Sequence, residues 1–156
     1  MTGRLQSEIK QKKGFASLQQ EAFLNLQRTA DVLMSIVEEA LRPARISHTQ
    51  YNLLRILRGS GKRGLACREV GERMLTHDPD VTRLLDRLED RGLVARSRDG
   101  KDRRVITTKI TGEGLKLLES LDRPMAEAVQ KSLAHLTHPQ LRNLTHLLET
   151  ARSRQG

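Results

Sequence analysis

The stretch VTRLLDRLEDRGLVARSRDGKDRRVITTKI, residues 81–110, decides the fold. Its first third places apolar residues at three- and four-residue steps, the spacing of one helix face. These residues are Val81, Leu84, Leu85 and Leu88. Gly92 then ends the helix. Runs rich in Val, Ile and Thr predict strands over 93–98 and 105–110, and Asp-Gly at 99–100 marks the turn between them. The stretch therefore predicts a helix followed at once by a two-stranded hairpin.

Positive charge is concentrated around the tip of this hairpin. Residues 91–104 hold six basic side chains against two acidic ones, Asp99 and Asp102. The basic ones are Arg91, Arg96, Arg98, Lys101, Arg103 and Arg104. The whole chain of 156 residues has a formal net charge of +9 and a pI of about 10.4. Such an excess favours a polyanionic partner, most commonly nucleic acid.

Two helices are expected in the first third of the chain. Ser17 with Gln20 forms a capping-box pattern, and the apolar spacing continues to residue 42, where Pro43 stops it. Ser47 with Gln50 forms a second capping box. The helix that it starts reaches the break GSGKRG at 59–64.

The remaining helices frame the hairpin. A short helix is expected over 67–75, and the helix of the opening stretch is expected over 79–91, with Asp78 as its cap and Pro79 as its first residue. Thr111 caps the helix that follows the hairpin, and Pro124 should bend this helix. Thr137 with Gln140 forms a last capping box. Short helices joined by a tight turn and followed by a hairpin predict a mainly α protein with a small β-hairpin, a winged helix-turn-helix.

Three segments resemble the MarR family of bacterial transcription regulators. They are ISHTQYNLLRIL (46–57), VTRLLDRLEDRGLVAR (81–96) and DRRVITTKITGEGLKLL (102–118). Within the third segment, Asp102 and Arg104 followed by Ile110-Thr111 and Gly114 come close to a family signature. With the flanking helices, the similarity covers nearly the whole chain.

The resemblance implies a domain organisation and a mode of action. A basic N-terminal arm over 1–16 precedes a MarR-type domain over 17–152. That domain has a winged-helix core at about 46–110 and dimerisation helices at about 17–42 and 111–152. The family pattern implies a homodimer that binds an inverted repeat in double-stranded DNA, here as a repressor, and that a small aromatic or carboxylate effector releases from its operator.

Burial of the apolar face of the helix at 79–91 predicts which side chains face DNA. Those turned outward are Asp80, Thr82, Arg83, Asp86 and Arg87. Arg pairs bidentately with guanine and Thr can contact a thymine methyl, so Thr82 and Arg83 are expected to read bases. Arg87 is expected to contact a phosphate or to pair with Asp86.

The hairpin tip is expected to lie over the adjacent minor groove, whose narrow A·T segments attract arginine. The cations available there are Arg98, Lys101, Arg103 and Arg104. Asp102 belongs to the same predicted DNA-binding set, but phosphate repels a carboxylate. Its expected role is therefore to orient Arg104 through a bidentate ion pair. The alternative is a charged loop that only aids solubility.

An effector pocket would use Leu24, Arg28, Tyr51 and Leu54 by resemblance, although these residues also suit a plain core. Cys67 fits either a small buried residue or a reactive thiol at a helix start. His135, His138 and His146 lack the spacing of metal ligands, so neither a metal nor a cofactor is expected.

Two function classes remain after these observations. The first is a sequence-specific transcription regulator, and the alternative is a non-specific DNA-architectural protein. An enzyme is not expected, because the sequence lacks a nucleophile–base pair and a Gly-rich phosphate loop. A single cysteine and an N-terminus without a signal-peptide pattern favour the cytoplasm.

Overall fold

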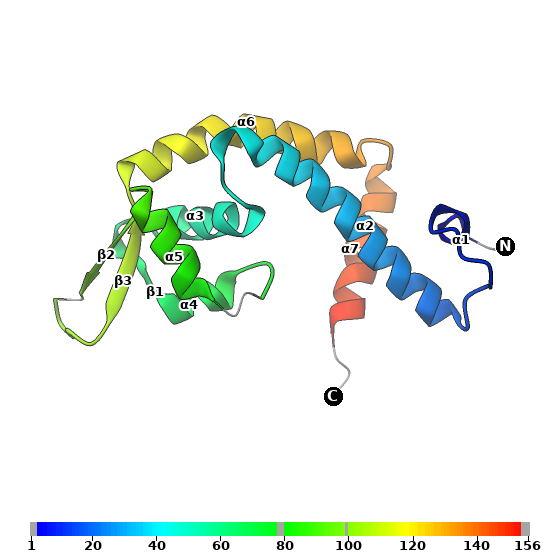
Figure 1. The fold of residues 1–156 in the computed structure, drawn as a ribbon, viewed down its shortest axis with the longest axis horizontal. Helices are drawn as coiled ribbons and strands as arrows, with labels where there is room; N and C mark the ends of the chain where they lie inside the picture. The colour runs from blue at the N-terminus through cyan, green and yellow to red at the C-terminus, as the bar shows by residue number, and fades with distance from the viewer. Residues whose placement is uncertain (1–2, 78–79, 99, 154–156) are drawn as a thin grey trace.

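A lobe built around buried leucines and a set of long helices make up the protein (Figure 1). The computed structural model describes residues 3–77, 80–98 and 100–153. Its elements, in chain order, are α1 (Leu5–Glu8), α2 (Leu18–Leu41), the 3-10 turn η1 (Arg42–Ala44), α3 (His48–Ser60), the 3-10 turn η2 (Gly61–Arg63), β1 (Leu65–Ala66), α4 (Cys67–Arg73), α5 (Val81–Asp90), β2 (Val94–Arg98), β3 (Ile106–Ile110), α6 (Gly112–Leu133) and α7 (His138–Arg152). The prediction of a mainly α fold with a small hairpin is confirmed.

The elements from α3 to β3 form what we call the winged-helix lobe. Its core consists of fully buried aliphatic side chains: Leu53, Leu54, Leu57, Leu65, Val70, Leu85, Leu88 and Val94. Helix α3 supplies three of them and lies at the centre. Leu41 at the end of α2 and Leu118 in the first half of α6 enter the same core. Each buried leucine contributes about 1.5–3 kcal/mol, so this core also attaches the long helices to the lobe.

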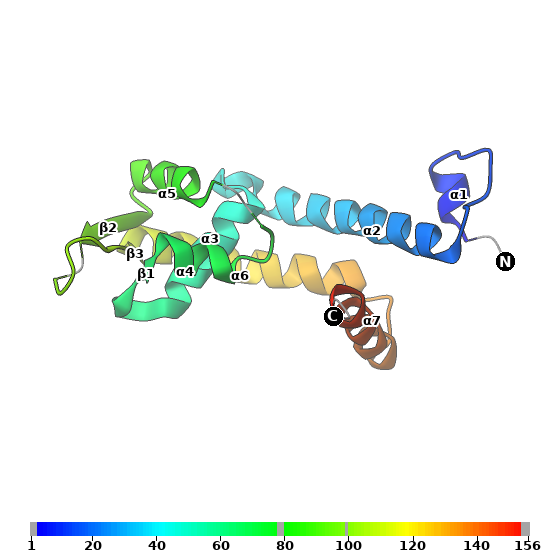
Figure 2. The same ribbon diagram turned by 90° about the horizontal axis from the view of Figure 1, so that it is seen from below.

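Helices α2, α6 and α7 form what we call the helical arm. Figure 2 shows α2 and α6 extending from the lobe side by side, and the two helices pack against each other. Arg58 of α3 joins the arm to the lobe through a bidentate ion pair with Asp122 of α6, at 2.9 and 3.0 Å. None of the described helices is long and apolar enough to cross a membrane.

The sheet confirms the predicted hairpin and adds a strand to it. Strands β2 and β3 are antiparallel, with Val94 opposite Ile110 and Arg98 opposite Ile106. The third strand, β1, pairs with the other side of β3, which gives the order β1–β3–β2. Two residues are too few to show a strand period, so the sequence did not predict β1. Asp99, half of the predicted Asp-Gly turn, lies outside the described residues.

The expected caps are largely confirmed. The capping boxes of Ser47 with Gln50 and of Thr137 with Gln140 are both present. At the start of α2, the Ser17 hydroxyl accepts the N–H of Gln20, but the Gln20 side chain accepts the N–H of Ala16 instead of completing the box. The N-terminal arm is partly helical: α1 lies within it, and Leu5 is only 2% exposed.

Two predicted helix boundaries were wrong. Helix α5 begins at Val81 with Asp80 as its N-cap, whereas Asp78 and Pro79 were expected at the start and lie outside the described residues. Helix α4 ends at Arg73 rather than at residue 75. Leu75 is 87% exposed, and its N–H donates to the side-chain oxygen of Asn52 at 2.9 Å. This tertiary hydrogen bond replaces another helical turn.

Gly114 lies where the first turn of α6 meets the sheet. A Cβ added at Gly114 would lie 2.3 Å from the carbonyl oxygen of Leu93, a backbone atom that cannot move away cheaply. We expect Gly114→Ala to destabilise the protein by about 1–3 kcal/mol, measured as a lower urea midpoint. Gly112→Ala is the matched control, because a Cβ there meets nothing within 4 Å. Equal stability of the two variants would contradict this packing.

The Arg58–Asp122 pair should also make stability depend on pH. The hydrogen bond from Arg58 lowers the pKa of the Asp122 carboxyl below its ordinary value. The stabilisation is therefore present above the unfolded-state pKa of about 4 and is lost as pH falls through the lower folded-state pKa. We expect the difference in urea midpoint between the wild type and Asp122→Asn to be largest above about pH 5 and to close toward pH 2.

The control for this measurement is Glu127→Gln, which removes a carboxylate paired with Arg123 one turn away on the exposed surface of α6. It should show a small difference from the wild type. A difference for Asp122→Asn that stayed constant with pH would contradict the role of the ion pair.

Candidate nucleic-acid interface

Helix α5 separates its apolar and polar side chains onto opposite faces. Leu85 and Leu88 are fully buried, and Val81 and Leu84 pack against the same core. The predicted inner face is therefore confirmed. On the opposite face the side chains of Thr82, Arg83 and Arg87 are exposed, where they can reach a ligand outside the lobe.

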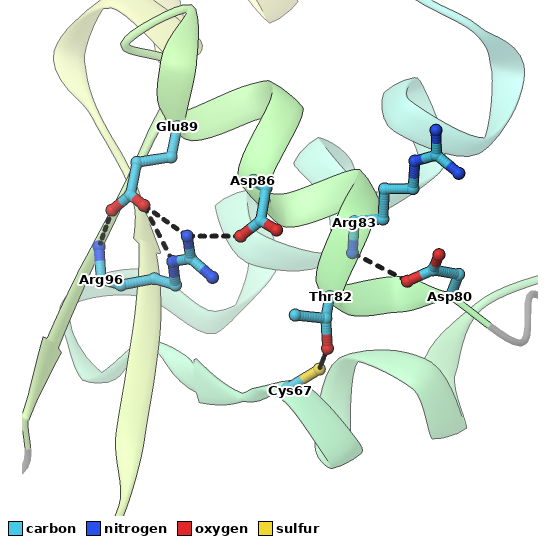
Figure 3. A network of polar contacts seen from close by, with 7 residues as sticks. All are labelled: Cys67, Asp80, Thr82, Arg83, Asp86, Glu89 and Arg96. Atoms are coloured by element: carbon cyan, nitrogen blue, oxygen red, sulfur yellow. Dashed lines mark hydrogen bonds and ion pairs between the residues drawn. The ribbon is translucent and has the colours of Figure 1, made fainter.

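Asp80, which was expected to face outward with these residues, caps the helix. Its carboxylate accepts the backbone N–H of Arg83 at 3.1 Å (Figure 3). A carboxylate in this position satisfies one of the unpaired N–H groups at the helix start and suits the positive end of the helix dipole. The direct role of Asp80 is thus to define where α5 begins, and so where Arg83 is presented.

Thr82 contacts the neighbouring helix of the lobe. Its hydroxyl lies 3.6 Å from the Cys67 sulfur at the start of α4 (Figure 3). Cys67 is half-buried and packs against the core, in agreement with its reading as a small apolar residue. The contact joins α4 to the first turn of α5.

Asp86 keeps 50% of its side chain exposed, and Arg96 of β2 binds it. The Arg96 guanidinium lies 2.6 Å from Asp86 and also donates to Glu89, at 2.9 Å from Nε (Figure 3). Its hydrogen bonds to Glu89 and then to Asp86 raise the pKa of Arg96, and the hydrogen bond from Arg96 lowers the pKa of Glu89.

Arg91 is also engaged inside the protein. Its guanidinium donates to the carbonyl oxygens of Arg45 at 2.8 Å and Ala44 at 3.1 Å. These carbonyls belong to the turn after α2, where Arg45 adopts a left-handed conformation with φ of 53°. Two of the six basic residues counted around the hairpin, Arg91 and Arg96, thus hold α5 in place.

The remaining cations of the hairpin are exposed at its tip. They are Arg98, Lys101, Arg103 and Arg104. Asp102 does orient Arg104, but its carboxylate accepts the backbone N–H of Arg104 at 3.0 Å. The expected pair with the guanidinium was wrong, because a two-residue separation within a turn brings the main chain closer than the long side chain.

A polar cleft of about 360 Å³ lies between the hairpin and the loop before α4. Cations from three different segments line it, Arg63, Arg98 and Lys109, and Arg63 also donates to Glu69 at 3.3 Å. Lys109 was not predicted, since its place in β3 reads as an ordinary exposed strand position. The pairing of β2 with β3 brings Lys109 near Arg98, and the pairing of β1 with β3 brings it near Arg63.

The four residues predicted for an effector pocket are not brought together within one chain. Tyr51 and Leu54 are buried in the lobe core, whereas Leu24 and Arg28 lie on the outer half of α2. Leu24 is about 20 Å along the helix from Val37, the residue at which α2 reaches the core. Arg28 lies 3.9 Å from Asp31 of its own helix. Among the described residues, no three His, Cys, Asp or Glu side chains are grouped as metal ligands would be.

Comparison with known proteins matches the lobe to one family. Residues 46–106 match the model of the MarR family. The HTH-type transcriptional repressor Rv2887 of Mycobacterium tuberculosis is 30% identical over 124 residues, which are 80% of this chain and 88% of that protein.

Solved structures agree with this match. A MarR transcription factor from Planctomyces limnophilus is 43% identical, with a TM-score of 0.67 over 87% of this chain and 98% of its own. Sco3205, a MarR family regulator from Streptomyces coelicolor solved in complex with DNA, shares the fold at 22% identity, with a TM-score of 0.79 over 90% of each chain. The chain therefore belongs to the MarR family, and it is a DNA-binding transcription regulator rather than an enzyme.

Proposed function

We propose that the protein is a homodimeric repressor that binds an inverted repeat in double-stranded DNA. The observation that carries this proposal is that one lobe presents two different exposed elements with the chemistry to bind DNA. The exposed face of α5 suits a major groove, and the cationic hairpin beside it suits the neighbouring minor groove. The protein is proposed to act in the cytoplasm.

On α5, Arg83 and Thr82 are proposed to read bases. Arg83 follows the cap by three residues and is exposed in the first turn of the helix, the part that enters a groove most deeply. Its fork of donors matches the two acceptors of guanine. Arg87, one turn later and also exposed, is proposed to contact phosphate.

The hairpin tip is proposed to supply Arg98, Lys101, Arg103 and Arg104 to the minor groove and its flanking phosphates. Each phosphate that they neutralise releases counterions, so affinity should fall steeply as salt rises. The backbone contact of Asp102 with Arg104 shapes the turn from which these side chains project.

The helical arm supports the dimer. Helix α7 has no buried residue, and large apolar side chains remain exposed along the arm. They are Leu18, Phe23, Leu26, Val32, Leu115, Val129, Leu144 and Leu147. Phe23 is 60% exposed and Leu147 is 55% exposed, which is costly for side chains of this size unless a second copy covers them. A two-fold pair of lobes would place two α5 helices about one DNA turn apart.

An effector site is proposed at the same interface. The partner's arm would cover the outer half of α2, where exposed Arg28 lies one helical turn from half-buried Leu24. A cation beside apolar side chains suits an aromatic carboxylate. Tyr51 and Leu54 would act from the core side, by fixing α3 rather than by lining the pocket.

Selection of bound sequences from a pool of random duplex DNA tests the proposal. We expect the wild-type protein to enrich an inverted repeat whose half-sites are about ten base pairs apart, centre to centre. Specific and scrambled duplexes are then compared by fluorescence anisotropy at matched salt. Equal affinities would instead indicate a non-specific architectural protein.

The dimer is tested on α7. We expect the double variant Leu144→Glu with Leu147→Glu to become monomeric in light scattering and to lose affinity for the inverted repeat, because two charges replace apolar contacts. Asn143→Glu with Thr150→Glu adds the same charge at exposed polar positions of α7 and should stay dimeric. A Leu144→Glu, Leu147→Glu protein that remained dimeric would contradict the assembly.

A further inference from the structure

We propose that Arg96 is a positioning residue for DNA recognition. Its contacts with Asp86 and Glu89 lock the hairpin to α5, so that the two elements engage neighbouring grooves as one unit. We call these three residues the wing clamp. The inference rests on the proposed function, and it assigns Arg96 and the two carboxylates to the geometry of the interface rather than to contact with DNA.

The clamp joins two elements by several independent hydrogen bonds (Figure 3). From Arg96 on β2, Nη2 lies 2.6 Å from Asp86 Oδ1 and 2.5 Å from Glu89 Oε2. Nε donates to the same Glu89 oxygen at 2.9 Å. Asp86 and Glu89 are three residues apart on α5, so both side chains leave the same side of the helix. A planar guanidinium can meet both at once, which the single ammonium of a lysine cannot reproduce.

Glu89 also binds the main chain of the strand. Its Oε1 accepts the backbone N–H of Arg96 at 3.1 Å. Strand β2 is an outer strand of the sheet, and its other side pairs with β3. One carboxylate of α5 therefore holds both the backbone and the side chain of the same strand residue, which resists sliding of the strand along the helix as well as rotation of the side chain.

The place of the clamp along the hairpin gives it leverage over the tip. Arg98, the first exposed cation of the tip, ends β2 two residues beyond Arg96, about 7 Å along the strand, and Lys101, Arg103 and Arg104 follow in the chain. A small pivot of the hairpin at Arg96 is therefore enlarged at Arg103 and Arg104. Helix α5 and the hairpin tip can reach neighbouring grooves together only if the angle between the helix and the hairpin is fixed.

The charge of the clamp distinguishes positioning from attraction to DNA. Two carboxylates and one guanidinium have a net charge of −1, and they lie beside the exposed face of α5. Within a Debye length of about 10 Å, this charge disfavours phosphate. Simple electrostatics predicts that loss of the Glu89 charge strengthens DNA binding. The clamp predicts the opposite, because the hairpin is then released.

The test compares full-length variants on the duplex that the wild type selects and on a scrambled duplex of the same length. Glu89→Gln and Arg96→Gln break the clamp from its two sides. Asp90→Asn removes an exposed carboxylate from the next position of α5 and serves as the charge-matched control for Glu89→Gln. Arg104→Ala represents the loss of a direct phosphate contact. Affinity is measured as a function of salt, with hydroxyl-radical footprints at the flanks.

We expect Glu89→Gln to bind the selected duplex about tenfold more weakly, the size of coupling that one ion-pair network provides. Asp90→Asn should bind as well as the wild type or better. The salt dependence of Glu89→Gln and Arg96→Gln should equal that of the wild type, whereas Arg104→Ala should lower the slope. Protection at the minor-groove flanks should be lost in both clamp variants while the major-groove contacts remain.

The clamp would be overturned if Glu89→Gln bound DNA as tightly as Asp90→Asn. It would also be overturned if Arg96→Gln lowered the salt dependence of binding, because Arg96 would then be a phosphate contact. Failure of the proposed function looks different. In that case the wild type binds the selected and scrambled duplexes equally, and weaker binding of Glu89→Gln than of Asp90→Asn on both duplexes would still support the clamp.

Discussion

Helix α5 is fixed from its inner side by the burial of Leu85 and Leu88, and the rest of the molecule depends on that attachment. Their two side chains are separated by less than one helical turn, so burying both sets the rotation of the helix about its axis. Thr82, Arg83 and Arg87 are thereby directed outward, where all three are exposed. The Asp80 cap then sets the first turn, and Arg91 anchors the last turn to the carbonyls that follow α2.

Arginines that look equivalent in the sequence divide into two groups according to what surrounds them. Arg91 and Arg96 lie where the chain doubles back on itself, beside carbonyls or carboxylates that receive their hydrogen bonds. Arg103 and Arg104 lie beyond the last paired residues of the hairpin, where the protein offers their side chains little except solvent. The net charge of +9 overstates the charge available to a partner at this surface, because part of it is used to assemble the surface.

Local rules predicted the parts of the fold that local forces decide. The capping boxes of Ser47 and Thr137, the apolar face of α5 and the hairpin all follow from spacing within a few residues. The start of α5 was placed too early because Pro79 suits a first helical position, while Asp80 satisfies the same cap rule two residues later.

Other features depend on residues far apart in the sequence and could not be read from spacing. The pairing of β1 with β3 and the contact of Arg91 with the turn after α2 join segments about 40 residues apart or more. The partners of Arg96 are only seven and ten residues away, yet the turn of the chain at Gly92 decides that they meet. The cations of the hairpin tip could be predicted from the sequence, because a side chain that is exposed to solvent needs no distant residue to fix its place.

The two edges of the small sheet are both unsuited to accept another strand. On one side β1 offers only two residues, and on the other the outward N–H of Arg96 is already occupied by Glu89. Unprotected edges rich in Val, Ile and Thr are templates for intermolecular β-pairing. The same carboxylate that binds Arg96 thus also limits intermolecular strand pairing at this edge.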